Sequence, residues 1–275
     1  MIRSLGTAQI CLLLAASAVT ASAIAGAGGA EVVPLERAHA HNDYNHARPL
    51  EDALGCGFCS VEVDVFLVDG KLLVAHDRDQ CRIDRDLETL YLAPLRERIQ
   101  ANDGSVYKNG PGLTLLIDIK SDAEKTYAAL DRLLAKYKDI FTEFRVDEIS
   151  QRAVTALISG HRPVSMITGQ ERRFAALDGR PADLKRDPSV SLVPLISTSW
   201  GSMFSWRGFG EMPQDERDKL DAFVKQAHEQ ERRVRFWALP WGPRVWEVVY
   251  EAGVDLINAD NLTGLRNFLL NKRDE

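Results

Sequence analysis

The sequence predicts a (β/α)₈ barrel, and three observations lead to this fold class. Eight short apolar runs recur along the chain, and most of them alternate with segments of helical period. The run 113–119 is almost continuously apolar, which is typical of a parallel strand buried on both faces. No run is followed by a P-loop or by the glycine-rich turn of a doubly wound nucleotide-binding sheet. The simplest architecture is a single α/β barrel over residues 31–275.

The elements follow from these patterns in chain order. Gly55 or Gly57 ends the first helix, and valines and isoleucines mark most of the strands. The expected strands are 36–42, 59–68, 113–119, 153–159, 173–178, 190–197, 234–239 and 254–258. The expected helices are 48–55, 92–99, a long helix ending near 137, then 215–229, 245–252 and a closing helix at 262–270.

Residues 1–30 have the layout of a secretory signal peptide. Arg3 is their only charge, an apolar run covers 10–19, and small residues fill 21–30. Cleavage is expected after Ala23 or Ala30. An uncleaved anchor is the alternative, but the apolar run is shorter than the roughly 20 residues that a membrane span needs. We therefore expect a secreted or periplasmic monomer without a stable membrane span.

Composition and cysteine usage narrow the function classes. The formal net charge is −6, so the basic footprint of a nucleic-acid-binding protein is absent. Without the signal peptide and its Cys11, an odd number of cysteines remains: Cys56, Cys59 and Cys81. The first two form a C-x-x-C pair with no second pair to complete a zinc site. We expect these thiols to pack as small apolar residues.

Acidic residues alternate with valines in the second expected strand. Side chains two residues apart in a strand point the same way, so Glu62 and Asp64 share one face and repel each other. A bound cation would relieve that repulsion, whereas a solvated strand face is the ordinary alternative. Asp69-Gly70 is a strong hairpin signal. A two-residue loop there pairs residue 63 with residue 76, which brings His76 to the level of the two acids.

Further polar groups end neighbouring strands. His41-Asn42-Asp43 ends the first strand and Asp118-Ile119-Lys120 ends the third. In a barrel all of these groups face one mouth, at the carboxyl ends of strands one to three. Carboxylate and amide oxygens suit Mg²⁺ or Ca²⁺, and two histidines suit a reaction that needs an acid and a base. An ion pair between Asp118 and Lys120 remains the structural alternative.

Together these motifs resemble the phosphodiesterase superfamily of phosphatidylinositol phospholipase C, glycerophosphodiester phosphodiesterase and sphingomyelinase D. Within it they are most similar to the small "HNDY" branch. The resemblance is specific over residues 37–120 and weaker at 235–237 and 253–258. The matching motifs are His41-Asn42-Asp43-Tyr44, Arg48-Pro49-Leu50, Gly57-Phe58, Glu62-x-Asp64, the segment 70–77 that ends in His76-Asp77, and Ile117-Asp118-Ile119-Lys120.

The resemblance implies a set of site residues. It implies His41 and His76 as the catalytic pair, and one divalent cation, Mg²⁺ or Ca²⁺, held by Glu62, Asp64 and Asp118 with Asn42 as a fourth ligand. Lys120 would contact phosphate and Trp237 would line the substrate pocket. Glycerophosphodiesterases carry Arg-Gly where this chain has Asn42-Asp43, so one phosphate contact is left for Arg162 or Arg180.

The expected activity is metal-assisted cleavage of glycerophosphodiesters or of (lyso)phospholipid head groups. An attacking hydroxyl on the substrate would form a cyclic phosphate first, so phosphoric diester hydrolase and phosphodiester lyase both stay open. A zinc amidohydrolase is a different class, because His39-x-His41 is also how such barrels begin. A non-catalytic barrel that binds a phosphorylated ligand is the third class. His39 is expected to face the barrel wall or to position His41, and His46 has no assigned role.

Overall fold

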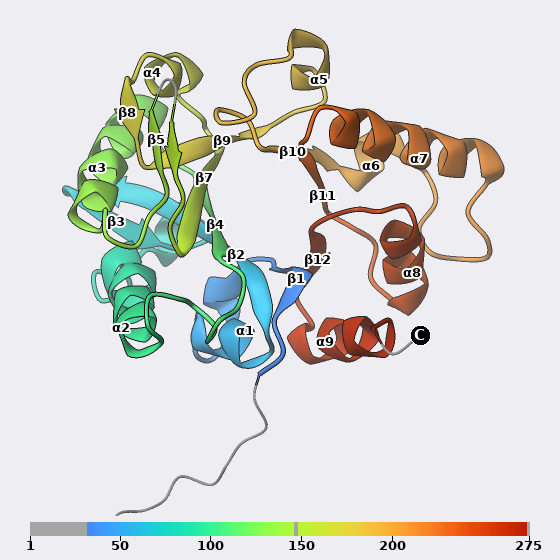
Figure 1. Ribbon diagram of the computed structural model, residues 1–275, viewed down its shortest axis with the longest axis horizontal. Helices are drawn as coiled ribbons and strands as arrows, with labels where there is room; N and C mark the ends of the chain where they lie inside the picture. The colour runs from blue at the N-terminus through green and yellow to red at the C-terminus, as the bar shows by residue number, and fades with distance from the viewer. Residues whose placement is uncertain (1–31, 146–147, 274–275) are drawn as a thin grey trace, which may run out of the picture. The chain divides into compact units, whose positions relative to one another are not determined.

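The computed structural model describes residues 32–145 and 148–273 and shows the predicted barrel (Figure 1). Its parallel strands lie in the order β11-β10-β9-β7-β4-β2-β1-β12. A parallel bridge from Arg235 to Leu256 joins the two ends of this order and closes the ring. The barrel strands are β1 (Leu35–Ala40), β2 (Phe58–Val68), β4 (Leu113–Ile119), β7 (Val154–Gly160), β9 (Ala175–Gly179), β10 (Leu195–Ser199), β11 (Arg233–Trp237) and β12 (Ile257–Ala259).

Helices surround the ring, as Figure 1 shows. Their polar faces meet solvent, and apolar faces such as Tyr127, Leu130 and Leu134 of α3 are buried against the strands. The α-helices are α1 (Glu51–Gly55), α2 (Ala93–Ala101), α3 (Ala123–Lys136), α4 (Val164–Thr168), α5 (Asp183–Arg186), α6 (Trp200–Met203), α7 (Gln214–Glu229), α8 (Pro243–Glu251) and α9 (Leu262–Asn271). Single turns of other helix types are η1 (Asp43–Asn45), η2 (Arg78–Gln80) and η3 (Glu88–Leu92).

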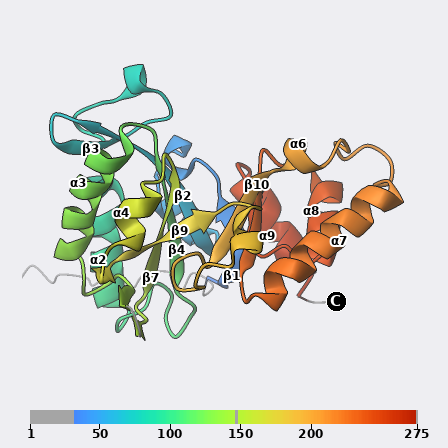
Figure 2. The same cartoon turned by 90° about the horizontal axis from the view of Figure 1, so that it is seen from above.

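The predicted hairpin is confirmed. Strand β3 (Lys71–Val74) returns antiparallel along β2, with Val68 paired to Lys71 across the two-residue loop. Asp69 and Gly70 both have positive φ, 47° and 80°, as the twist of a tight hairpin requires. Figure 2 shows this arm and the segment after it extending beyond one end of the barrel. The register delivers His76 to the end of β2 that carries Asp64.

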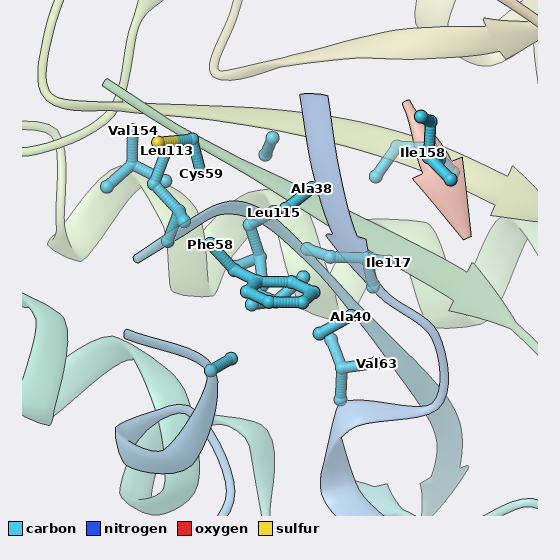
Figure 3. Close-up of a cluster of buried hydrophobic side chains, with 14 of the residues drawn as sticks. Ala38, Ala40, Phe58, Cys59, Val63, Leu113, Leu115, Ile117, Val154 and Ile158 are labelled. Carbon is cyan, nitrogen blue, oxygen red and sulfur yellow. The ribbon is translucent and has the colours of Figure 1, made fainter. Parts of the chain in front are cut away.

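One face of β2 carries apolar side chains and the other carries polar side chains. Val61, Val63 and Val65 are fully buried on the outer face of the barrel wall, where they join the large core beneath the helices (Figure 3). Ser60, Glu62 and Asp64 alternate with them and therefore face the barrel interior. A smaller apolar cluster fills part of the interior, and its members are Leu116, Phe144, Leu157, Ala176, Leu195 and Leu256.

Several expected strand boundaries are wrong by two to five residues; the last strand, expected from residue 254, begins at Ile257, and two other misses have a local reason. The strand expected at 190–197 begins only at Leu195, because the amides of Leu192 and Val193 donate to the Ser189 carbonyl and form a turn. The strand expected to begin at Arg173 begins at Ala175. Arg173 instead pairs in a small separate sheet made of β5 (Glu143–Arg145), β6 (Ile149–Ser150) and β8 (Arg172–Arg173). Such short pairings carry little sequence signal.

The predicted signal peptide, residues 1–30, lies outside the described residues. Within 32–145 and 148–273, no helix is long and apolar enough to span a bilayer. Cys56, Cys59 and Cys81 are all free thiols, and Cys59 is buried. The expected packing of Cys59 as a small apolar residue is therefore confirmed, while Cys56 and Cys81 are half-buried.

Candidate active site

Three carboxylates meet at the carboxyl ends of two neighbouring strands. Glu62 and Asp64 extend from β2, and Asp118 extends from β4, where it pairs in register with Asp64. One oxygen from each of the three lies within 4.8 Å of the others. Like charges this close repel strongly in a buried setting, so positive charge is required nearby. The sequence prediction that these acids form one cluster is borne out geometrically.

Lys120 supplies part of that positive charge. Its Nζ lies 3.2 Å from Asp64 Oδ2 and 3.3 Å from Asp118 Oδ2. Burial still raises the pKa of Asp118 to about 6, although Lys120 acts in the opposite direction. Burial likewise raises the pKa of Asp64. The second oxygens, Oδ1 of Asp64 and Oδ1 of Asp118, are buried without a hydrogen-bond partner among the described residues.

Glu62 has a different environment. Burial alone would raise its pKa, but the Arg235 guanidinium and His39 hold it well below the usual range. Arg235 Nη2 donates to Glu62 Oε2 at 2.7 Å, and His39 Nε2 lies 3.4 Å from the same oxygen. Burial lowers the pKa of His39 to about 4, so this ring is neutral at pH 7. Glu62 is therefore ionised at neutral pH, and Arg235 and His39 hold its carboxylate in place.

His41 follows β1 and is held by the last barrel strand. Its Nδ1 lies 2.8 Å from Asp260 Oδ1, just after β12, and its Nε2 lies 4.0 Å from Glu62 Oε2. Burial lowers the pKa of His41, but Asp260 and Glu62 outweigh burial and the pKa is raised overall. The carboxylate of Asp260 directs the Nδ1 proton toward itself and leaves Nε2 facing the acidic cluster.

His76 is held in a similar way and contacts a different acid of the cluster. Its Nδ1 lies 3.1 Å from Asp64 Oδ2 and 3.2 Å from the Tyr44 hydroxyl. The Tyr44 hydroxyl donates to Asp64 Oδ2 at 2.7 Å, and the oxygen of this hydroxyl also lies 3.0 Å from Asn42 Oδ1. Each histidine thus has one ring nitrogen on a carboxylate, and the two rings contact different acids of the cluster, Glu62 for His41 and Asp64 for His76.

A cavity of about 500 Å³ opens beside His76. Its wall is polar and is formed in part by the segment that follows β3. The lining includes Tyr44, His46, His76, Gln80, Arg82 and Arg85. Arg85 is fixed there by donating to the Tyr44 carbonyl at 2.6 Å. His76 is therefore one of the residues that line this cavity.

The other predicted site residues lie at or just after the ends of later strands, and none of their predicted contacts with a ligand is tested by the structure. Trp237 ends β11 and is 43% exposed, so it is available to a ligand at the barrel mouth. Arg162 donates to the Asp178 carbonyl at 2.5 Å, and Arg180 pairs with the Asp178 carboxylate at 2.8 Å. Within the described residues, neither arginine makes a hydrogen bond or ion pair to the three acids or two histidines. Their phosphate contact stays a prediction, as does ligation by Asn42.

Of the two alternatives expected for His39, facing the barrel wall or positioning His41, the second is wrong. His39 Nδ1 lies 2.7 Å from Ser60 Oγ and its Nε2 faces Glu62, so it positions the acid rather than His41. Because both ring nitrogens are used, His39 is not available as a zinc ligand. The candidate metal-binding group in residues 32–145 and 148–273 consists of carboxylates alone, which does not favour the amidohydrolase alternative.

Three residues at the site were not assigned from sequence: Tyr44, Arg235 and Asp260. Tyr44 belongs to the His-Asn-Asp-Tyr motif, which gave no reason to separate it from its neighbours. Asp260 comes directly after the last strand, so the rule that strand ends carry function would have found it. Arg235 sits inside an apolar strand, where a buried charge signals a partner but does not identify it.

The fold and the site together define a class: a (β/α)₈ barrel of the superfamily that contains glycerophosphodiester phosphodiesterases and phospholipase C-like enzymes. Residues 29–177 match the family model of the AIM6-like phosphodiesterase domain. The chain belongs to that family. The matched region holds both histidines and all three acids of the cluster, whereas Arg235 and Asp260 lie beyond it.

Curated relatives and solved structures agree with this family. The chain is 28% identical to the altered inheritance of mitochondria protein 6 homolog of Arthroderma benhamiae, over 86% of this chain and 84% of that protein. It is also 28% identical to altered inheritance of mitochondria protein 6 of Eremothecium gossypii, over 86% of this chain and 70% of that protein.

Two crystal structures of glycerophosphodiester phosphodiesterases share the fold. The enzyme from Parabacteroides distasonis aligns with a TM-score of 0.57 at 15% identity, over 87% of this chain and 98% of that one. The enzyme from Agrobacterium tumefaciens aligns with a TM-score of 0.50 at 16% identity, over 85% and 99% of the two chains. At these identities the likeness concerns the fold, and the expected barrel class is confirmed.

Proposed function

We propose that this protein cleaves phosphodiesters by acid–base catalysis with His41 and His76. One observation carries the proposal: each histidine has its Nδ1 on a carboxylate, and each ring contacts the three-acid cluster, His41 at Glu62 and His76 at Asp64. Such pairs fix the tautomer and leave Nε2 to exchange a proton with substrate. In this arrangement one ring removes the proton of the attacking hydroxyl and the other protonates the leaving alkoxide.

We further propose a divalent cation at Glu62, Asp64 and Asp118. The buried, unpartnered Oδ1 atoms of Asp64 and Asp118 fit this assignment, because a buried carboxylate oxygen without a partner is costly. An all-oxygen donor set favours Mg²⁺ or Ca²⁺. When bound, the cation would neutralise charge on the phosphate and lower the pKa of the attacking hydroxyl. Asn42 is the proposed fourth ligand.

The remaining groups would bind and orient the substrate. Lys120 lies at the edge of the acid cluster and carries the positive charge that a phosphate needs. Trp237 offers an exposed apolar face at the mouth, and Arg162 or Arg180 would reach a phosphate oxygen from strand ends β7 and β9. The polar cavity beside His76 fits the hydrophilic alcohol of a glycerophosphodiester or of a (lyso)phospholipid head group.

The test compares candidate substrates directly. Purified protein is incubated with glycerophosphocholine, lysophosphatidylcholine, phosphatidylinositol or bis-p-nitrophenyl phosphate in Mg²⁺, Ca²⁺ or EDTA, and products are followed by ³¹P NMR. A cyclic phosphate product indicates a lyase, and an open monoester indicates a hydrolase. Full activity after complete chelation would contradict the cation, and the absence of any turnover would favour a phospho-ligand-binding barrel.

The histidines are tested by substitution. His41→Ala and His76→Ala should each lower turnover by about 10²-fold to 10⁴-fold, the usual contribution of a general acid or base. His228→Ala is the matched control, since His228 also contacts a carboxylate, Asp255, at 2.9 Å but lies on α7. Full activity of His41→Ala or His76→Ala would refute the acid–base assignment.

A further inference from the structure

A second polar layer lies inside the barrel against the acid cluster. It consists of Arg235, Asn258, His39 and Ser60, from four different strands, and all four are buried, with exposed fractions of 2%, 7%, 0% and 0%. Burying a guanidinium, an amide, an imidazole and a hydroxyl in one interior is costly unless each finds a partner. The contacts of these groups converge on Glu62.

Arg235 is fixed at two points. Its Nη2 donates to Glu62 Oε2 at 2.7 Å, and its Nε donates to Asn258 Oδ1 at 2.8 Å. Because the guanidinium is planar, two bonds in different directions set both its position and its orientation. A lysine at this position would keep the charge but would have no second donor group held in the same plane.

His39 reaches the same carboxylate oxygen from the neighbouring strand. Its Nε2 lies 3.4 Å from Glu62 Oε2, while its Nδ1 lies 2.7 Å from the hydroxyl of Ser60, its register partner on β2. Since Oε2 is an acceptor, the ring hydrogen belongs on Nε2 and the Ser60 hydroxyl donates to Nδ1. Oε2 therefore receives two donors, whereas no hydrogen bond joins Oε1 to a residue in the described part of the chain.

We infer that Arg235 is a positioning residue for the cation proposed above, acting through Glu62. By engaging Oε2, Arg235 and His39 fix the rotation of the carboxylate and leave Oε1 for the ion. This inference rests on the proposed function, because it assumes that Glu62 binds a cation. Groups that hold a ligand in place in this way commonly change metal affinity by 10-fold to 100-fold.

The test measures Mn²⁺ binding to the full chain by electron paramagnetic resonance, independently of turnover. Arg235→Met should weaken Mn²⁺ binding by about 10-fold to 100-fold, and Arg235→Lys and His39→Asn should weaken it by smaller factors. Arg233→Met is the matched control. Arg233 is the next arginine on the same face of β11, but its Nη1 and Nη2 contact Thr114 Oγ1 at 3.2 Å rather than an acid of the cluster.

Each outcome decides the question. Unchanged Mn²⁺ affinity in a folded Arg235→Met protein overturns the inference, and so does an equal loss in Arg233→Met, because that would indicate a general effect of barrel packing. If Arg235→Met does not fold, unchanged affinity in both Arg235→Lys and His39→Asn overturns it. Failure of the unmodified protein to bind Mn²⁺ instead refutes the cation itself, so the two failures are distinguishable. Circular dichroism and the melting temperature report folding in every case.

Discussion

Gly160 leaves room for the carboxylate of Asp118, since a Cβ atom added at position 160 would lie 2.0 Å from Asp118 Oδ1. The same atom would lie 2.5 Å from the Ile119 carbonyl oxygen, and Gly160 has a φ of +65°, which disfavours other residues. The end of β7 therefore leaves space for Asp118, the acid that β4 contributes to the cluster.

Gly160→Ala should accordingly disturb both stability and the site. We expect a loss of about 1–3 kcal/mol in the free energy of unfolding, from the strained φ and the clash with backbone. Mn²⁺ affinity should fall as well, because Asp118 must move. Urea denaturation and metal titration measure the two effects. Gly55→Ala is the control, since nothing lies within 4 Å of its added Cβ; equal effects of both substitutions would count against the assignment.

Asp260→Asn should reduce turnover by roughly 10²-fold, since the amide no longer fixes the tautomer of His41. Asp260 also helps to raise the pKa of His41. Removing it should lower that pKa, so the step in the pH–rate profile that belongs to His41 should move to lower pH. Steady-state kinetics across pH would test this. An unchanged kcat and an unchanged profile would show that Asp260 is not needed.

Tyr44→Phe should lower activity while leaving the fold intact. The Tyr44 hydroxyl contacts Asp64, His76 and Asn42, so its loss should reduce kcat by about 10-fold, equivalent to one hydrogen bond to a charged group. Tyr91→Phe is the comparison. Tyr91 donates to the buried Asp43 at 2.9 Å, away from the histidines, so its loss should lower the melting temperature more than kcat. The reverse pattern would contradict the proposed site.

Divalent cations should stabilise the protein. At a free concentration 100 times the dissociation constant, Mg²⁺ or Ca²⁺ should add about 2.7 kcal/mol to the free energy of unfolding, because it binds the folded state alone. Thermal melts with and without EDTA measure the shift. Asp118→Asn should lose most of it, whereas Asp187→Asn, at a carboxylate paired with Arg232 outside the cluster, should keep it. Equal shifts in both variants would indicate non-specific ion effects.

Cys59 should make the protein less stable at alkaline pH. Burial raises the pKa of its thiol from 9.0 to about 12, so the unfolded chain ionises first as the pH rises. The stability that depends on the protonated thiol is therefore lost progressively above about pH 9. The difference in unfolding free energy between wild type and Cys59→Ala, measured from pH 7 to 10, isolates this effect. A constant difference would contradict it.

Much of the candidate site was accessible from sequence because local rules determine it. Strand period placed Glu62 and Asp64 on one face, and the Asp69-Gly70 turn fixed the register that carries His76 back along β2. Because functional residues of such barrels lie at the carboxyl ends of the strands, these groups were expected to meet Asp118 at one mouth of the barrel. The small sheet containing Phe144 escaped prediction because its strands are only two or three residues long.

The sequence by itself determined the order of elements, the two faces of each strand and the residues that end them. Only the tertiary structure decided which inward-facing side chains meet. Arg235 contacts Glu62 across 173 positions of sequence, and Asp260 contacts His41 across 219. Both contacts exist because closure of the ring brings the last strands beside the first. Local periodicity cannot encode that closure, since it depends on the tilt and stagger of the whole sheet.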